Sequence, residues 1–110
     1  MVETASPDEV IARLAALYRR NGYIRWLKPD RRAREGPFYK KGDELRLVAN
    51  SDRELRTIRR LLRLAGFVPV RAFRKAKQWR QPVYGRAEVS RFLKLIRDRG
   101  RSNRTKRMKA

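Results

Sequence analysis

The sequence predicts a single α+β domain in which three helices pack on one face of a four-stranded antiparallel sheet. The chain has 110 residues, the size of one ordinary domain. Apolar residues make up 41% of it, which is enough for a buried core. Hydrophobic patterns follow one another in the order helix, strand, strand, helix, strand, strand, helix. The sheet face without helices would then be an open groove.

The first helix is expected over about residues 7–20. Ser6 can cap this helix, Pro7 suits the first helical position and Glu9 completes a capping box. Apolar residues then recur at helical spacing, and Gly22 ends the run.

Two strands are expected next, at Tyr23–Lys28 and Asp43–Ala49. The first is rich in β-branched and aromatic residues, which favour strands. The second alternates apolar and other residues, with Glu44, Arg46 and Val48 opposite the apolar row. This alternation is typical of an antiparallel strand with one face in the core.

The second half of the chain repeats the order of elements. A capping box at residues 51–54 starts a helix that ends near Gly66. Two strands are expected at about Phe67–Lys75 and Trp79–Tyr84, and the last helix around Val89–Ile96.

The chain is strongly basic. Its 31 Lys and Arg residues and 11 Asp and Glu residues give a formal net charge of +20. A compact body with this charge repels itself unless a polyanion screens it, and nucleic acid is the abundant polyanion inside a cell. The folded domain is expected to span residues 1–96. Residues 97–110, with seven basic residues and one acidic residue, are expected to form a flexible tail.

Several classes of protein are excluded by what the sequence lacks. It contains no Cys and no His, which excludes disulfides, His-dependent catalytic triads and zinc sites built from these residues. Any metal would need oxygen ligands, which favours Mg²⁺ or Ca²⁺. No apolar run approaches the roughly 20 residues of a membrane span, and residues 1–8 lack the layout of a signal peptide. We therefore expect an intracellular protein without a membrane partner.

Residues 14–22 read LAALYRRNG and resemble the LAGLIDADG motif that names a family of homing endonucleases. Four residues match the motif outright: Leu14, Ala15, Leu17 and Gly22. Ala16 replaces the first motif Gly with another small residue. The order of elements over residues 6–96 also resembles that of the family. The resemblance implies an αββαββα homing-endonuclease-like fold with an open DNA-binding sheet.

The resemblance also implies a homodimer, because the family pairs two motif helices and this chain has one motif. Ala12, Ala15 and Ala16 leave one side of the first helix with little side-chain bulk, which would allow two such helices to approach closely. The alternative is that these alanines lie under the sheet of their own protomer.

The family's catalytic acid stands directly before the motif Gly, and here that position holds Asn21. The resemblance therefore implies that Asn21 occupies the catalytic position and that Asn21 and the Gly22 backbone are weak ligands for Mg²⁺ or another divalent cation. Arg19, at a further acidic position of the motif, adds repulsion toward a cation. We expect DNA cleavage to be impaired or absent with Asn21 and present with Asp at this position. The sequence leaves three explanations for Asn21. It is the natural residue at the catalytic position, a deliberate replacement of Asp, or an ordinary helix-end residue that tolerates left-handed backbone angles.

Strand alternation selects the candidate DNA contacts on the open face: Tyr23, Arg25, Arg46, Arg71, Lys75, Lys77 and Arg80. Ile24 and Trp26 are expected on the core side of the first strand. The stretch from Phe67 to Ala87 contains six basic residues and no acidic one. Arg can fork onto guanine edges, whereas Lys mostly contacts phosphates.

Sequence-specific binding of double-stranded DNA by a homodimer is the first functional hypothesis. RNA binding by a maturase-like or ribosome-associated protein is the second, and a basic protein–protein module is the third. A dimeric reader of duplex DNA would prefer a pseudo-palindromic site, whereas an RNA binder would show no such symmetry.

Overall fold

The computed structural model describes residues 6–26 and 43–109, with side chains described as far as Asp98. The elements in these ranges are α1 (Pro7–Asn21), β1 (Tyr23–Arg25), β2 (Glu44–Ala49), α3 (Asp52–Leu64), β3 (Phe73–Lys75), β4 (Gln78–Tyr84) and α4 (Arg86–Lys109). The strands form one antiparallel sheet in the order β1-β2-β4-β3. The predicted α+β class and order of elements are confirmed.

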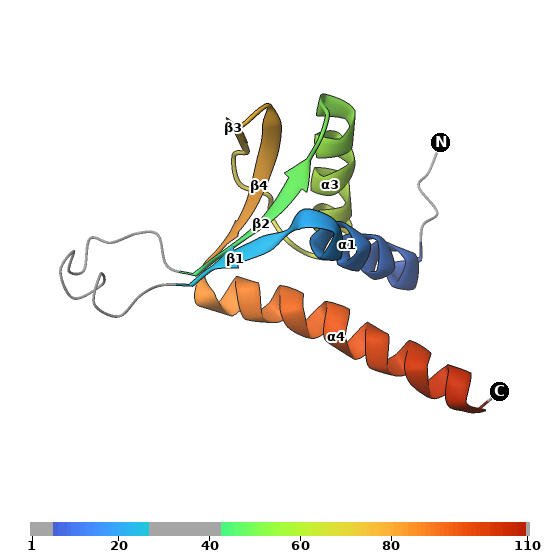
Figure 1. Cartoon of the computed structure of the whole chain (residues 1–110). Helices are drawn as coiled ribbons and strands as arrows, with labels where there is room; N and C mark the ends of the chain where they lie inside the picture. The colour runs from blue at the N-terminus through green and yellow to red at the C-terminus, as the bar shows by residue number, and fades with distance from the viewer. Residues whose placement is uncertain (1–5, 27–42, 110) are drawn as a thin grey trace.

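The helices α1, α3 and α4 lie on one side of the sheet, and no described helix covers the other side (Figure 1). Leu45, Leu47 and Ala49 of β2 are fully buried between the sheet and these helices. The helices contribute the following buried residues to this core: Val10, Leu14, Ala15, Ile58, Leu61, Leu62, Val89, Phe92 and Ile96. One hydrophobic core therefore holds the sheet and helices together.

Helices α1 and α3 both start at the predicted serine caps. The hydroxyl of Ser6 accepts a hydrogen bond from the Glu9 backbone N–H at 3.2 Å, and Ser51 accepts one from the Glu54 N–H at 3.0 Å. These bonds satisfy backbone donors that have no partner inside the first helical turn. The starts of α1 and α3 are thus encoded locally.

The first strand is shorter than predicted. Its pairing with β2 ends where Arg25 faces Glu44, so Trp26 has no strand partner that continues the alternation. Ile24 packs against the core as expected, but Trp26 is 60% exposed, and its prediction as a core residue is wrong. Lys28, predicted at the end of this strand, lies outside the described residues.

The predicted strand from Phe67 is also shorter, because side chains hold its first half. The carbonyl oxygen of Val70 accepts hydrogen bonds from Arg59 Nη1 at 2.8 Å and from Gln81 Nε2 at 2.7 Å. Gln81 is fully buried, and its own Oε1 accepts from Arg59 at 2.7 Å. Pro69 has no N–H to offer to a sheet. This segment is therefore fixed by α3 and β4 rather than by strand pairing.

Two of the candidate DNA contacts consequently lie outside strands. Arg71 precedes β3, so its predicted place in a strand is wrong. Lys77 lies in the turn between β3 and β4, where Ala76 and Lys77 have φ angles of 51° and 65°. Positive φ at both central residues is the conformation of a two-residue type I′ hairpin.

The last helix is longer than predicted. We expected it to end near Ile96 and residues 97–110 to form a tail, but α4 continues through Lys109. This stretch contains no Pro, and its many Arg and Lys residues favour helix. The predicted helix end is therefore wrong.

Candidate nucleic-acid interface

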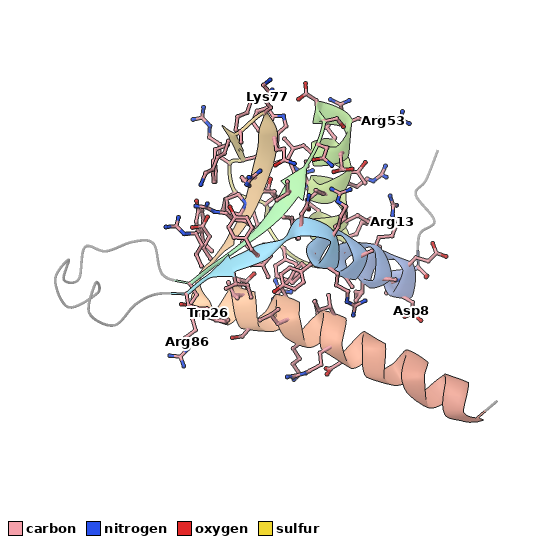
Figure 2. The ribbon with its side chains drawn as sticks, in the orientation of Figure 1. Asp8, Arg13, Trp26, Arg53, Lys77 and Arg86 are labelled. Atoms are coloured by element: carbon pink, nitrogen blue, oxygen red, sulfur yellow. The ribbon has the colours of Figure 1, made fainter. Side chains whose placement is uncertain are left out.

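The candidate interface is the side of the sheet that α1, α3 and α4 leave uncovered, which we call the open face. Strand register and alternation place these residues on it: Tyr23, Arg25, Glu44, Arg46, Val48, Phe73, Lys75, Gln78, Arg80, Pro82 and Tyr84. Arg25 and Lys75 are exposed on the two edge strands. Side chains project from both sides of the sheet, and Lys77 lies at the far end of the β3–β4 hairpin (Figure 2).

Arg46, at the centre of this face, is only 6% exposed. Its Nε donates to Glu44 Oε2 at 2.5 Å, and Glu44 is 2% exposed. The guanidinium carbon lies 4.8 Å from the Phe73 ring centroid and 5.7 Å from that of Tyr23, within cation–π range. Because these contacts hold it inside the protein, Arg46 is not the extended base-reading side chain that the alternation indicated.

Tyr23 joins two arginines of this face. Its hydroxyl oxygen accepts hydrogen bonds from Arg46 Nη1 at 3.1 Å and from Arg80 Nε at 3.3 Å. Partial burial opposes ionisation of the phenol, but the two hydrogen bonds and positive charges outweigh it and lower the pKa of Tyr23. Arg80 also donates from Nη1 to Gln78 Oε1 at 3.0 Å. The predicted residues Tyr23, Arg46 and Arg80 therefore form one connected cluster.

Sequence reasoning missed three members of this cluster: Glu44, Phe73 and Gln78. Glu44 and Arg46 are two residues apart on one strand, which places both on one sheet face and could have indicated the ion pair. Phe73 and Gln78 depend on the register of the β3–β4 hairpin, which the sequence alone left undefined.

Asn21 is the last residue of α1 and is partly buried. Its Oδ1 accepts a hydrogen bond from Arg20 Nε at 3.5 Å. Arg20 also forms a salt bridge with Glu54, whose pKa it lowers, and donates to the Val48 carbonyl at 2.9 Å. Within the described ranges, no group of three or more acidic side chains could hold a metal ion.

Gly22 is required for space rather than for an unusual backbone angle. Its φ is −73°, which any residue can adopt. Asn21 is not among the described non-Gly residues with positive φ, so it does not use the left-handed backbone angle that the sequence suggested for it. A Cβ at this position would lie 2.8 Å from both Cδ1 and the carbonyl oxygen of Tyr18. The Gly22 N–H donates to this carbonyl at 2.8 Å. The chain therefore passes too close to Tyr18 for any side chain.

The three alanines of α1 lie in different surroundings. Ala15 is 5% exposed and belongs to the core, as the alternative interpretation held, so its prediction as an interface residue is wrong. Ala12 and Ala16 are exposed and lie one turn apart on the same helix face.

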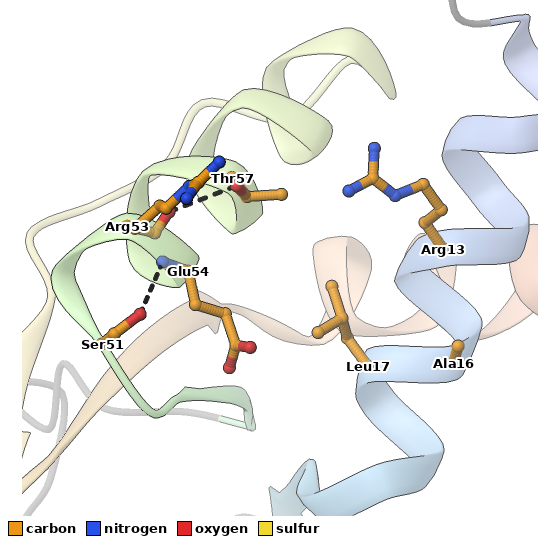
Figure 3. A pocket seen from close by; sticks show the side chains of 7 residues that line it. All are labelled: Arg13, Ala16, Leu17, Ser51, Arg53, Glu54 and Thr57. Atoms are coloured by element: carbon orange, nitrogen blue, oxygen red, sulfur yellow. Dashed lines mark hydrogen bonds between the residues drawn. The ribbon is translucent and has the colours of Figure 1, made fainter.

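A hollow of about 420 Å³ lies between α1 and the start of α3, on the helix side of the sheet. It is lined by Arg13, Ala16, Leu17, Ser51, Arg53, Glu54 and Thr57 (Figure 3). Arg13 reaches from α1 toward α3 in this view. The helix side is also basic along α3, where Arg53, Arg56, Arg60 and Arg63 are exposed. Positive charge is therefore present on both sides of the sheet.

Comparisons of the chain with protein-family models, curated proteins and solved structures gave no match. None of the helices in the described ranges is both long enough and apolar enough to cross a membrane. The fold and site together define a basic α+β domain whose open face combines arginine, lysine and aromatic side chains.

Proposed function

We propose that the protein binds double-stranded DNA as a homodimer and reads its sequence with the open face. One observation carries this proposal: three of the four strands bring Arg25, Lys75 and Arg80 to one side of the sheet, where no described helix covers them. The formal net charge of +20 supplies the long-range attraction to a polyanion. The order of elements supports the resemblance to LAGLIDADG homing endonucleases, from which the duplex specificity is taken.

The proposed dimer pairs two α1 helices through the face that carries Ala12 and Ala16. Both side chains are small and exposed, so a second helix could approach the backbone closely there. Arg20, one turn beyond Ala16, extends the same face with a long side chain. The closest contact would therefore lie in the first two-thirds of the helix.

DNA cleavage is proposed as the ancestral activity rather than that of the present sequence. Asn21 has no negative charge to attract Mg²⁺, and its amide oxygen accepts a long hydrogen bond of 3.5 Å from the cation of Arg20. The protein would then bind its site without cutting it efficiently. Mg²⁺ or another divalent cation is the proposed cofactor only for a form with an acid at this position.

RNA is the second candidate partner, and the aromatic side chains of the open face favour it. Tyr84 lies on this face and is 36% exposed. Exposed rings on a sheet can stack on unpaired bases. Preference for a structured RNA over any duplex DNA would replace the first proposal with this one.

The open face can be tested against the helix side by removing equal charge from each. We expect duplex binding by the parent to weaken steeply with salt, with a log–log slope of roughly −0.9 for each phosphate contacted. Arg25→Gln with Lys75→Gln should reduce the affinity and make the slope shallower by about two such contacts. Arg56→Gln with Arg63→Gln, which removes two charges from α3, is the matched control. The proposal would be contradicted if the two double variants lost the same affinity for the duplex, or if the salt slope of the parent were near zero.

A further inference from the structure

We propose that Tyr23, Arg46 and Arg80 form a site for one phosphate group, occupied by a backbone phosphate of the bound nucleic acid. This inference rests on the proposed function, because it specifies what one part of the open face contacts. It goes further in assigning the cluster to a phosphate oxygen rather than to a base edge.

The first argument is an excess of hydrogen-bond donors. Arg46 uses Nε and Nη1, and Arg80 uses its own Nε and Nη1, in the bonds to Glu44, Tyr23 and Gln78. Among the described residues, no hydrogen bond joins Nη2 of either arginine to an acceptor. The Tyr23 oxygen accepts twice, and its own O–H likewise donates to none of the described residues. The cluster therefore has more donors than acceptors among the described residues, and a backbone phosphodiester offers only acceptors at neutral pH.

The second argument is charge. The two guanidinium groups of this cluster both approach one phenol oxygen, within 3.1 and 3.3 Å. Glu44 is the carboxylate paired with Arg46, whereas the hydrogen-bond partners of Arg80 among the described residues, Tyr23 and Gln78, are uncharged. The cluster thus keeps a net positive charge in a partly desolvated place, where an anion is bound more strongly than in water.

The third argument is geometry. Arg46 is clamped between the rings of Phe73 and Tyr23, so it cannot extend into a groove to reach a base. Tyr23 and Arg80 keep partial exposure on the open face, so a group that comes to the protein surface can reach them. Phosphates line the surface of a duplex and match this arrangement better than base edges, which are recessed in the grooves.

Glu44 acts through Arg46 and is a positioning residue. Its Oε2 holds Arg46 Nε at 2.5 Å, and this bond leaves the terminal nitrogens of Arg46 directed to Tyr23 and its surroundings. Two charged side chains that are 2% and 6% exposed need each other to remain buried.

The test uses the full chain and a short fluorescent duplex of random sequence, because phosphate contacts do not depend on the base sequence. Arg80→Gln should weaken duplex binding about ten-fold and make the salt slope shallower by about 0.9. Arg56→Gln removes the same charge from α3 and should change the affinity about two-fold or less. Tyr23→Phe keeps the ring but removes the O–H donor and the oxygen that positions Arg46 and Arg80, so it tests the site even if Arg80→Gln fails to fold. It should weaken binding about three-fold or more.

A second arm tests the site without DNA. The side-chain Nε–Hε NMR signal of Arg80, assigned from its loss in Arg80→Gln, should shift on addition of inorganic phosphate but not with chloride at equal ionic strength. If inorganic phosphate competes with the duplex for the parent protein but not for Arg80→Gln, free phosphate also enters the site. Equal effects of Arg80→Gln and Arg56→Gln, together with an unmoved Arg80 signal, would overturn the inference. If the parent does not bind the duplex but its Arg80 signal shifts with phosphate, the proposed function is overturned and the phosphate site remains.

Discussion

Arg20 determines the surroundings of the motif position at residue 21. It holds Asn21 Oδ1 and the Glu54 carboxylate and donates to a carbonyl of β2, so the end of α1 is tied to both α3 and the sheet. Gly22 then donates its N–H to the Tyr18 carbonyl at 2.8 Å, in a place where a side chain would clash with Tyr18. Residue 21 is thus firmly placed beside a cation that would also pair with any carboxylate introduced there.

Asn21→Asp is predicted to create Mg²⁺-dependent cleavage of a DNA site that the protein binds. The added carboxylate supplies the negative charge that a divalent cation requires, and the partner protomer would supply a second one. Cleavage should be slow, because the Arg20 guanidinium competes with the metal for the new carboxylate.

Gel analysis of the DNA with Mg²⁺ or Mn²⁺ would measure this cleavage, with Asn21→Ser as a neutral control. Equal cleavage by the parent would show that another acid holds the metal. If the Asn21→Asp protein binds the DNA but leaves it intact, the missing carboxylate is not the only difference between this chain and an active nuclease.

Individual side chains were predictable from the sequence where alternation alone decides their surroundings. Ile24, Leu45 and Leu47 face the core as predicted, because strand alternation directs them there. Arg46 shares the correct face, but its burial depends on Phe73 and Glu44 of the same face. The sequence could indicate its direction and not its partners.

At the scale of the element, α1 presents two different faces. Ala15 packs into the core, whereas Ala16, the next residue, is exposed beside the hollow between α1 and α3. Small residues at positions 12, 15 and 16 looked alike in the sequence because helical spacing alone does not say which side meets the sheet. The same substitution at Ala15 and at Ala16 therefore compares a core position with a position in the proposed dimer interface.

We predict opposite outcomes for one substitution made at these two positions. Ala15→Glu would bury an uncompensated charge and lower the free energy of unfolding by about 3–5 kcal/mol. Ala16→Glu should change that free energy in the separated protomer by only about 0.5 kcal/mol, yet dissociate the dimer by placing two charges at its contact. Chemical denaturation and sedimentation measure the two effects. A folded Ala16→Glu variant as dimeric as the parent would remove α1 from the interface.

Element boundaries were predictable where the signal is local. The starts of α1 and α3 depend on Ser6 and Ser51, which act within one turn. The start of β3 instead depends on Arg59 and Gln81, which reach Val70 from distant parts of the chain. Local patterns contain no information about such contacts.

For the whole molecule, the formal net charge is +20, and basic side chains of the described residues lie on both sides of the sheet. The arginines along α3 add attraction to nucleic acid without defining which surface meets it. The open face differs from them in being broad, helix-free within the described residues and rich in aromatic groups. A homodimer would present two such faces related by a two-fold axis, and a DNA target would then mirror that symmetry.

The most direct test of this account is selection of bound sequences from a random duplex-DNA library at about 150 mM salt, where non-specific phosphate contacts are weakened. We predict enrichment of one pseudo-palindromic site with a fixed spacing between its half-sites. The library could instead yield no enriched or symmetric sequence, while the same protein still binds a structured RNA at this salt. That result would contradict the proposal that a homodimer reads duplex DNA.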